Sequence, residues 1–173
     1  MAKSTRQYVF EGMELLPSAL IPFVEKRLET SLKGHWQVQV LEKLPSLRPN
    51  SNGEVGWDQA ALFNAMDRFW SEAFKAVLGR AERSLVNELS DVRNKLSHNE
   101  TFTYDDAERA LDTMRRLMEA ISAGETAEQL GKMRDTILRT KFTELQRNEE
   151  RRKTQRLEIS VETVAGLLPW REV

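Results

Sequence analysis

The stretch "ELSDVRNKLSHNETFTYDDAERAL", residues 88–111, holds the end of one helix, a short turn and the start of another. Before the turn, apolar residues recur every three or four positions, which is typical of one buried helix face. Thr103, with Asp106 three residues later, is close to the capping-box pattern that begins a helix. The connection is short, so we expect an antiparallel pair. The predicted buried positions are Leu78, Ala81, Leu85, Leu89, Val92, Leu96, then Ala107, Ala110, Leu111, Met114, Leu117, Met118 and Ile121.

The sequence on both sides of this pair also favours helices, because Gly and Pro are few and good helix formers are common. A helix is predicted over residues 8–32. Its two prolines, Pro17 and Pro22, are expected to divide it into two pieces with a bend. Asp58 is a candidate N-cap for a helix that runs to Val77. The composition therefore predicts an all-α protein.

Three other segments differ in how firmly their pattern predicts structure. Residues 36–40, "WQVQV", fit either one short strand or the start of a helix, since five residues do not decide between the two periods. Residues 44–56 are rich in Pro, Asn, Ser and Gly and predict a loop. A last long helix is expected over residues 126–156. The tail, residues 157–173, fits a strand and turn, a packed tail or a linker.

Composition limits the chemistry that the chain can perform. The 173 residues include no cysteine and two histidines, which excludes disulfides, thiolate catalysis and His-rich metal sites. No clustered Asp/Glu motif indicates magnesium or calcium, so we predict no metal site and no cofactor. The net charge of −1 gives no overall attraction to nucleic acid. No apolar run approaches the ~20 residues that span a bilayer, and no signal peptide is visible, so we expect a cytoplasmic protein without membrane contact.

Arg93 and His98 stand at the end of the first helix of the pair. They are five residues apart, so they lie ~140° apart around a helix and ~7.5 Å apart along its axis. On a continuous helix their side chains do not converge. They converge if the helix ends at or before His98 and the imidazole folds back, or if the helix meets its own copy across a two-fold axis.

These residue types suit the cleavage of RNA. A metal-free ribonuclease needs a group that moves protons near neutral pH, which histidine supplies, and a fixed cation for the phosphorane, which arginine supplies. Asn94 is a candidate to hold the imidazole or to donate to the phosphate. The ordinary alternative is that His98 caps the last carbonyls of the helix and that Arg93 is solvated.

The segment "DVRNKLSHNETFTYDDAERALDTMRRLMEAI" resembles the signature of the HEPN (higher eukaryotes and prokaryotes nucleotide-binding) superfamily. In that signature an Arg, a polar residue and then a His end one long helix and are followed by another. Arg93, Asn94 and His98 occupy those positions. The flanks "GRAERSLVNEL" and "FTYDDAERALDTM" are similar to one branch. It contains the synthetic-lethal-with-TREX ribonuclease and domains at the N-termini of large bacterial ATPases, often among phage-defence genes.

The resemblance implies an up-and-down helical bundle that forms a homodimer, with the two Arg/His sets in a shared cleft. It implies a metal-independent endoribonuclease with catalytic residues Arg93, Asn94 and His98, in phage defence or RNA quality control. The alternative is a non-catalytic module for dimerisation and for sensing a nucleotide or partner, at the N-terminus of a larger defence ATPase. We expect a bundle over residues 1–156, with its motif core at 57–122, and a tail or linker to a following domain at 157–173.

Other residues are weaker candidates for contact with RNA. Lys95, Ser97 and Tyr104 lie beside the motif and are predicted to line the same cleft as substrate-binding residues. Residues 132–156 carry nine Lys/Arg against four acids, which fits either a stripe that follows phosphates or a solvated helix face. At the motif helix we expect Leu89 and Val92 to face the core. The partner chain is expected to border Arg93, Asn94, Ser97 and His98.

Overall fold

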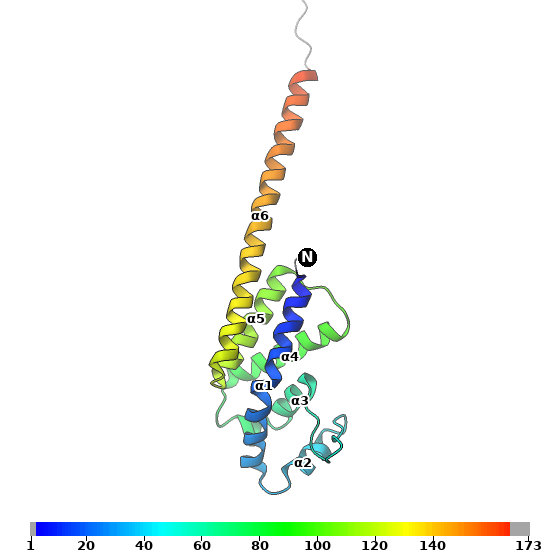
Figure 1. Cartoon of the computed structure of the whole chain (residues 1–173), viewed down its shortest axis with the longest axis vertical. Helices are drawn as coiled ribbons and strands as arrows, with labels where there is room; N and C mark the ends of the chain where they lie inside the picture. The colour runs from blue at the N-terminus through cyan, green and yellow to red at the C-terminus, as the bar shows by residue number, and fades with distance from the viewer. Residues whose placement is uncertain (1–2, 167–173) are drawn as a thin grey trace, which may run out of the picture. The chain divides into compact units, whose positions relative to one another are not determined.

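The computed structural model describes residues 3–166, and every regular element in that range is helical (Figure 1). The chain divides into two compact units, Met1–Ile137 and Leu138–Val173, which we describe separately. The predicted all-α class is therefore confirmed. The helices, in chain order, are α1 (Thr5–Leu32), α2 (Trp36–Lys43), α3 (Gln59–Arg68), the π-helical turn η1 (Trp70–Phe74), α4 (Arg80–Ser97), α5 (Tyr104–Ala120) and α6 (Gly124–Gly166).

Helix α1 is the central element of the first unit and packs against α3, η1, α4 and α5. It is one continuous 28-residue helix, so the predicted break at Pro17 and Pro22 is wrong. Proline inside a helix costs about 3 kcal/mol. Here the helix buries a full-length apolar stripe, and that packing outweighs the two prolines. The stripe consists of Val9, Met13, Leu16, Leu20, Val24 and Leu28.

The predicted helix from Asp58 to Val77 forms only in part. Asp58 caps α3 as expected, because its Oδ1 accepts from the backbone N–H of Ala61 at 2.7 Å. After Arg68 the chain changes to the wider π turn η1, so a single helix to Val77 is wrong. This turn buries Trp70, Ala73 and Phe74 together. The burial of Trp70 and Phe74 on one side of this turn thus overrides simple helical continuity.

The ambiguous segment "WQVQV" begins helix α2, so the strand alternative is wrong. Among residues 3–166 the β-type pairing is limited to one isolated antiparallel bridge, Pro49 with Val55, inside the predicted loop. Helix α6 starts at Gly124 and continues past residue 156 to Gly166. The strand-and-turn alternative for the tail is therefore wrong over residues 157–166, and residues 167–173 lie outside the described part of the chain. The assignment of residues 1–156 to one domain and 157–173 to a tail or linker stays a prediction.

Helices α4 and α5 form the expected antiparallel pair. Lys95 near the end of α4 lies over the Phe102 ring just before α5, and Glu88 on α4 pairs with Arg109 further along α5. On α4 the predicted residues Leu85, Leu89, Val92 and Leu96 are buried, whereas Ala81 in the first turn is exposed. Leu89 and Val92 face the core, as expected. On α5 the predicted face is buried except for Ile121, which is half-buried after the last helical residue.

Candidate functional site

The C-terminus of α4 is closed by a Schellman motif that fixes the position of His98. His98 is the C-cap residue, and Asn99 follows in the left-handed region with φ 56°. The backbone N–H of Glu100 donates to the Lys95 carbonyl at 3.0 Å, and that of Asn99 donates to the Leu96 carbonyl at 3.2 Å. These two bonds are the 6→1 and 5→2 pair of that motif. The helix therefore ends just before His98, as the sequence predicted.

The motif residues divide between two faces of α4. Arg93 and Ser97 are four apart and share one face, and the Ser97 hydroxyl donates to the Arg93 carbonyl at 3.1 Å. Asn94 and His98 are also four apart and lie about 100° further around the helix. Arg93 is half-buried, whereas Asn94, Ser97 and His98 are exposed. Asn94 and His98 are thus presented to solvent, while Arg93 is directed against neighbouring helices.

Arg93 and Ser97 line a shallow groove between three helices. Its volume is about 190 Å³. We call it the α1–α3–α4 groove, and its lining residues are Arg6, Phe10, Met13, Glu14, Gln59, Arg93, Leu96 and Ser97. Arg6, Phe10, Met13 and Glu14 come from one side of α1, and Gln59 is the first residue of α3. The groove places a second arginine, Arg6, beside the motif.

The first turn of α1 holds the helix end that carries the motif. Arg6 Nη2 donates to the Leu96 carbonyl at 2.9 Å, and the Thr5 hydroxyl donates to the Phe102 carbonyl at 2.6 Å. These bonds attach α1 to both sides of the α4–α5 turn. Arg6 Nε is buried and has no hydrogen-bond partner within the described protein. Arg6 therefore positions the motif helix and also lines the groove.

The start of α5 lies directly after the motif turn. Lys95 Nζ stands 5.2 Å from the centre of the Phe102 ring, a cation–π contact. The Thr103 backbone N–H donates to Asp106 Oδ2 at 3.0 Å, and the Asp106 N–H donates to the Thr103 hydroxyl at 3.1 Å. The backbone hydrogen bond from Thr103, helped by its hydroxyl, holds the pKa of Asp106 below its ordinary value. Tyr104 is the first residue of α5 and is half-buried.

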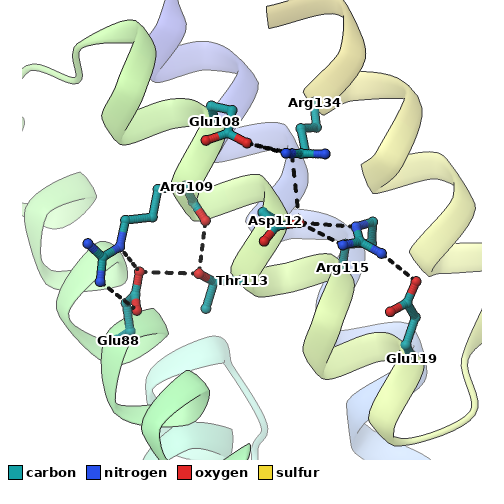
Figure 2. A network of polar contacts seen from close by, with 8 residues as sticks. All are labelled: Glu88, Glu108, Arg109, Asp112, Thr113, Arg115, Glu119 and Arg134. Carbon is teal, nitrogen blue, oxygen red and sulfur yellow. Dashed lines mark hydrogen bonds and ion pairs between the residues drawn. The ribbon is translucent and has the colours of Figure 1, made fainter. Parts of the chain in front are cut away.

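Away from the motif turn, polar contacts hold α5 to its neighbours (Figure 2). Arg109 Nε donates to Glu88 Oε1 at 2.7 Å, and the Thr113 hydroxyl lies 3.2 Å from the same oxygen. The hydrogen bond from Arg109 lowers the pKa of Glu88. On the other side of α5, Arg134 of α6 pairs with Glu108 at 2.6 Å. This network joins α4, α5 and the start of α6, and it lies outside the motif.

The described residues contain no cluster of three or more His, Cys, Asp or Glu side chains that could hold a metal ion. Within residues 3–166, no helix combines the length and the apolar character needed to cross a membrane.

Of the residues predicted from sequence, the structure groups Arg93 with Ser97 in the groove and places Asn94 and His98 on the next face. Lys95 is engaged with Phe102. The groove residues Arg6 and Phe10 were not predicted. Their spacing of four on the first helix signals only a shared face, because a sequence pattern does not say which helices meet.

These features define a class: a helical bundle in which Arg93, Asn94 and His98 end one helix of an antiparallel pair is a HEPN domain. The family model described as Swt1-like HEPN matches residues 11–122, and the chain belongs to this family. The predicted resemblance is thereby confirmed. No curated protein and no solved structure gives a significant match to the chain.

Proposed function

We propose that this protein is a metal-independent endoribonuclease whose active site combines Arg93 and His98 from two copies of the chain. The observation that carries the proposal is the complete Arg93–Asn94–His98 motif at the end of α4, with His98 exposed at a fixed helix terminus. Membership of the Swt1-like HEPN family supports it. By resemblance, its action belongs to phage defence or RNA quality control in the cytoplasm.

The chemistry uses the 2′-hydroxyl of RNA as the nucleophile. A histidine takes the proton of that hydroxyl, and the oxygen attacks the adjacent phosphorus. The bond from phosphorus to the 5′-oxygen breaks, and protonation of that oxygen by a histidine completes the step. The products are a 2′,3′-cyclic phosphate and a 5′-hydroxyl. Arg93 binds the phosphoryl oxygens as negative charge develops on them.

A dimer supplies the geometry that one helix lacks. Arg93 and His98 lie ~140° apart around α4, and Arg93 faces the groove while His98 is exposed. A two-fold axis beside Asn94 brings His98 of one copy toward Arg93 of the other, and closed two-fold pairing is the commonest symmetry of soluble oligomers. Asn94 then orients the imidazole. Lys95, Ser97 and Tyr104 border the same cleft and contact substrate.

The test is cleavage of a mixed RNA pool in EDTA. Wild-type protein is expected to cut RNA and to leave cyclic phosphate ends. His98→Ala is expected to lower the rate by about 100-fold or more, because general acid–base catalysis contributes 10²–10⁴. The control is His35→Ala, which removes the other histidine from an exposed position without a side-chain capping bond. Equal trace activity in the wild type and His98→Ala would contradict the catalytic role.

A second candidate function is a non-catalytic sensing or dimerisation module of a larger defence ATPase. The observation that favours it lies in the second unit. From residue 142 to 166 of α6 every side chain is exposed, including the apolar Phe142, Leu145, Leu157, Ile159, Val161 and Val164. An isolated helix is marginal in water, so such a segment favours a partner. Nucleotide or partner binding without RNA cleavage would support this candidate.

A further inference from the structure

We infer that the α1–α3–α4 groove is a nucleotide subsite for single-stranded RNA, in which Arg6 and Arg93 hold a phosphate and Phe10 stacks on the adjoining base. This inference rests on the proposed function and extends it to residues outside the motif. Arg6 and Phe10 precede residue 11, where the family match begins.

The charge of the groove suits a phosphodiester. Its lining includes two guanidinium groups, from Arg6 and Arg93, and one carboxylate, from Glu14. The Gln59 amide donates to that carboxylate at 2.7 Å, which keeps it engaged within the protein. The net charge of the lining is thus positive, as a monoanionic phosphate requires.

Arg6 has the donor capacity for such a ligand. Its Nη2 is committed to the Leu96 carbonyl, whereas its Nε is buried without a partner. The buried Nε is not reachable from the groove, so a phosphate oxygen accepts from the Nη groups of Arg6, which carry four of the five N–H donors of a guanidinium. Arg93 contributes a second fork that matches phosphate oxygens.

Phe10 gives the groove an aromatic rim. Its side chain is 48% exposed, although it is one turn from Arg6 on the same face of α1. Nucleic-acid proteins without strict sequence preference combine cationic grooves with exposed aromatic rings on which bases stack. The groove volume of about 190 Å³ is below the ~300–1,000 Å³ of pockets that enclose whole small molecules. It therefore fits a phosphate and its sugar, with the base outside on Phe10.

The experiment measures RNA binding apart from cleavage. The parent is the full chain with His98→Ala, so that RNA stays intact, and the probe is a short fluorescein-labelled single-stranded oligoribonucleotide followed by anisotropy. Phe10→Ala is expected to weaken binding about tenfold, because stacking on an aromatic ring contributes 1–3 kcal/mol per base. Arg6→Gln is expected to weaken binding and to reduce the slope of log affinity against log salt by about 0.7, the value for one single-strand phosphate contact.

The matched control is Arg80→Gln, which removes one positive charge at the opposite end of α4 and is expected to bind like the parent. Thermal unfolding shows whether each variant is folded. Phe10 is exposed and takes no part in the hydrogen bond from Arg6 to the Leu96 carbonyl, so Phe10→Ala tests the groove without removing that bond. Unchanged affinity in either groove variant, or no RNA binding by the parent, overturns the inference. If wild type does not cut RNA but both groove variants lose affinity, the subsite stands and the endoribonuclease proposal is wrong.

Discussion

At the scale of single residues, Asn99 decides where the motif helix stops. Its φ of 56° places it in the left-handed region, which most side chains enter only at a penalty. Asn tolerates this conformation and Gly enters it freely. Because Asn99 directly follows His98, its left-handed conformation turns the chain away after His98 and makes His98 the C-cap of α4.

Substitution of Asn99 tests this role through stability. Asn99→Ala is expected to lower the free energy of unfolding by about 1 kcal/mol, since an L side chain with a Cβ and no local hydrogen bond is strained there. Asn99→Gly is expected to keep or raise stability. Urea denaturation of the three proteins measures the difference. Equal stability of the Ala and Gly variants would mean that the left-handed turn is not populated in solution.

The identities of the motif residues could be predicted from sequence, and so could the helix end at His98. The residues that lie beside Arg93 in the folded protein could not be predicted. Arg6 is 87 residues away from it in the chain, and only the packing of α1 across α4 brings both side chains to one groove. Periodicity reports the face of a single helix and carries no information about its partner.

At the scale of elements, the antiparallel pair of α4 and α5 is the part of the fold that the local sequence determines most fully. The apolar residues at every third or fourth position, the capping box and the short turn all indicate the same antiparallel pair, so sequence alone predicts it. Helices α1 and α3 are different. Two prolines inside α1 and the change from α3 to η1 violate local preference, and both are explained by burial: Leu16 and Leu20 beside Pro17, and Trp70 and Phe74 in the π turn. Tertiary packing decides such cases.

The α5 capping box predicts a pH dependence of stability. The Thr103 backbone N–H holds the pKa of Asp106 below its ordinary value of 3.8. A carboxyl group with a depressed folded-state pKa contributes stability that is present above its unfolded pKa and is lost as the pH falls through the folded value. The contribution of Asp106 is therefore complete at neutral pH and fades below about pH 4.

Asp106→Asn measures this contribution because it mimics the protonated acid and keeps an acceptor for Thr103. We expect wild type to be more stable than Asp106→Asn at pH 7, and the gap to narrow on acidification below the ordinary carboxyl range. Urea unfolding of both proteins at each pH gives the difference between their free energies of unfolding. Because all other carboxyl groups are present in both proteins, their titration cancels in this difference. A gap that stays constant with pH would refute the assignment.

At the scale of the whole first unit, Gly12 shows how closely α1 approaches its neighbours. A Cβ at Gly12 would lie 2.7 Å from Leu111 Cδ2, 3.0 Å from Met114 Sδ and 3.3 Å from Leu130 Cδ2. All three side chains are fully buried. The absence of a side chain at this position therefore sets the distance between α1, α5 and the start of α6.

Two glycine substitutions separate this packing from helix propensity. Gly→Ala inside a helix gains up to about 1 kcal/mol in propensity. At Gly131 the added Cβ meets only Arg115 Cδ at 3.5 Å, so Gly131→Ala is expected to raise the melting temperature. At Gly12 overpacking costs about 1–3 kcal/mol and outweighs the gain, so Gly12→Ala is expected to lower it. A rise in both variants would show that the core around Gly12 yields easily.

The central claim is that Arg93 of one copy and His98 of another form one catalytic site. The direct measurement is RNA cleavage in EDTA by a mixture of Arg93→Ala and His98→Ala chains, after sedimentation has verified a mass near twice the 20.0 kDa of one chain. Each variant alone is expected to be nearly inactive. Half of the dimers in an equal mixture are mixed, and each holds one intact pair, so about a quarter of wild-type activity should return. No recovery from verified mixed dimers, or a wild-type chain that stays monomeric, would contradict the claim.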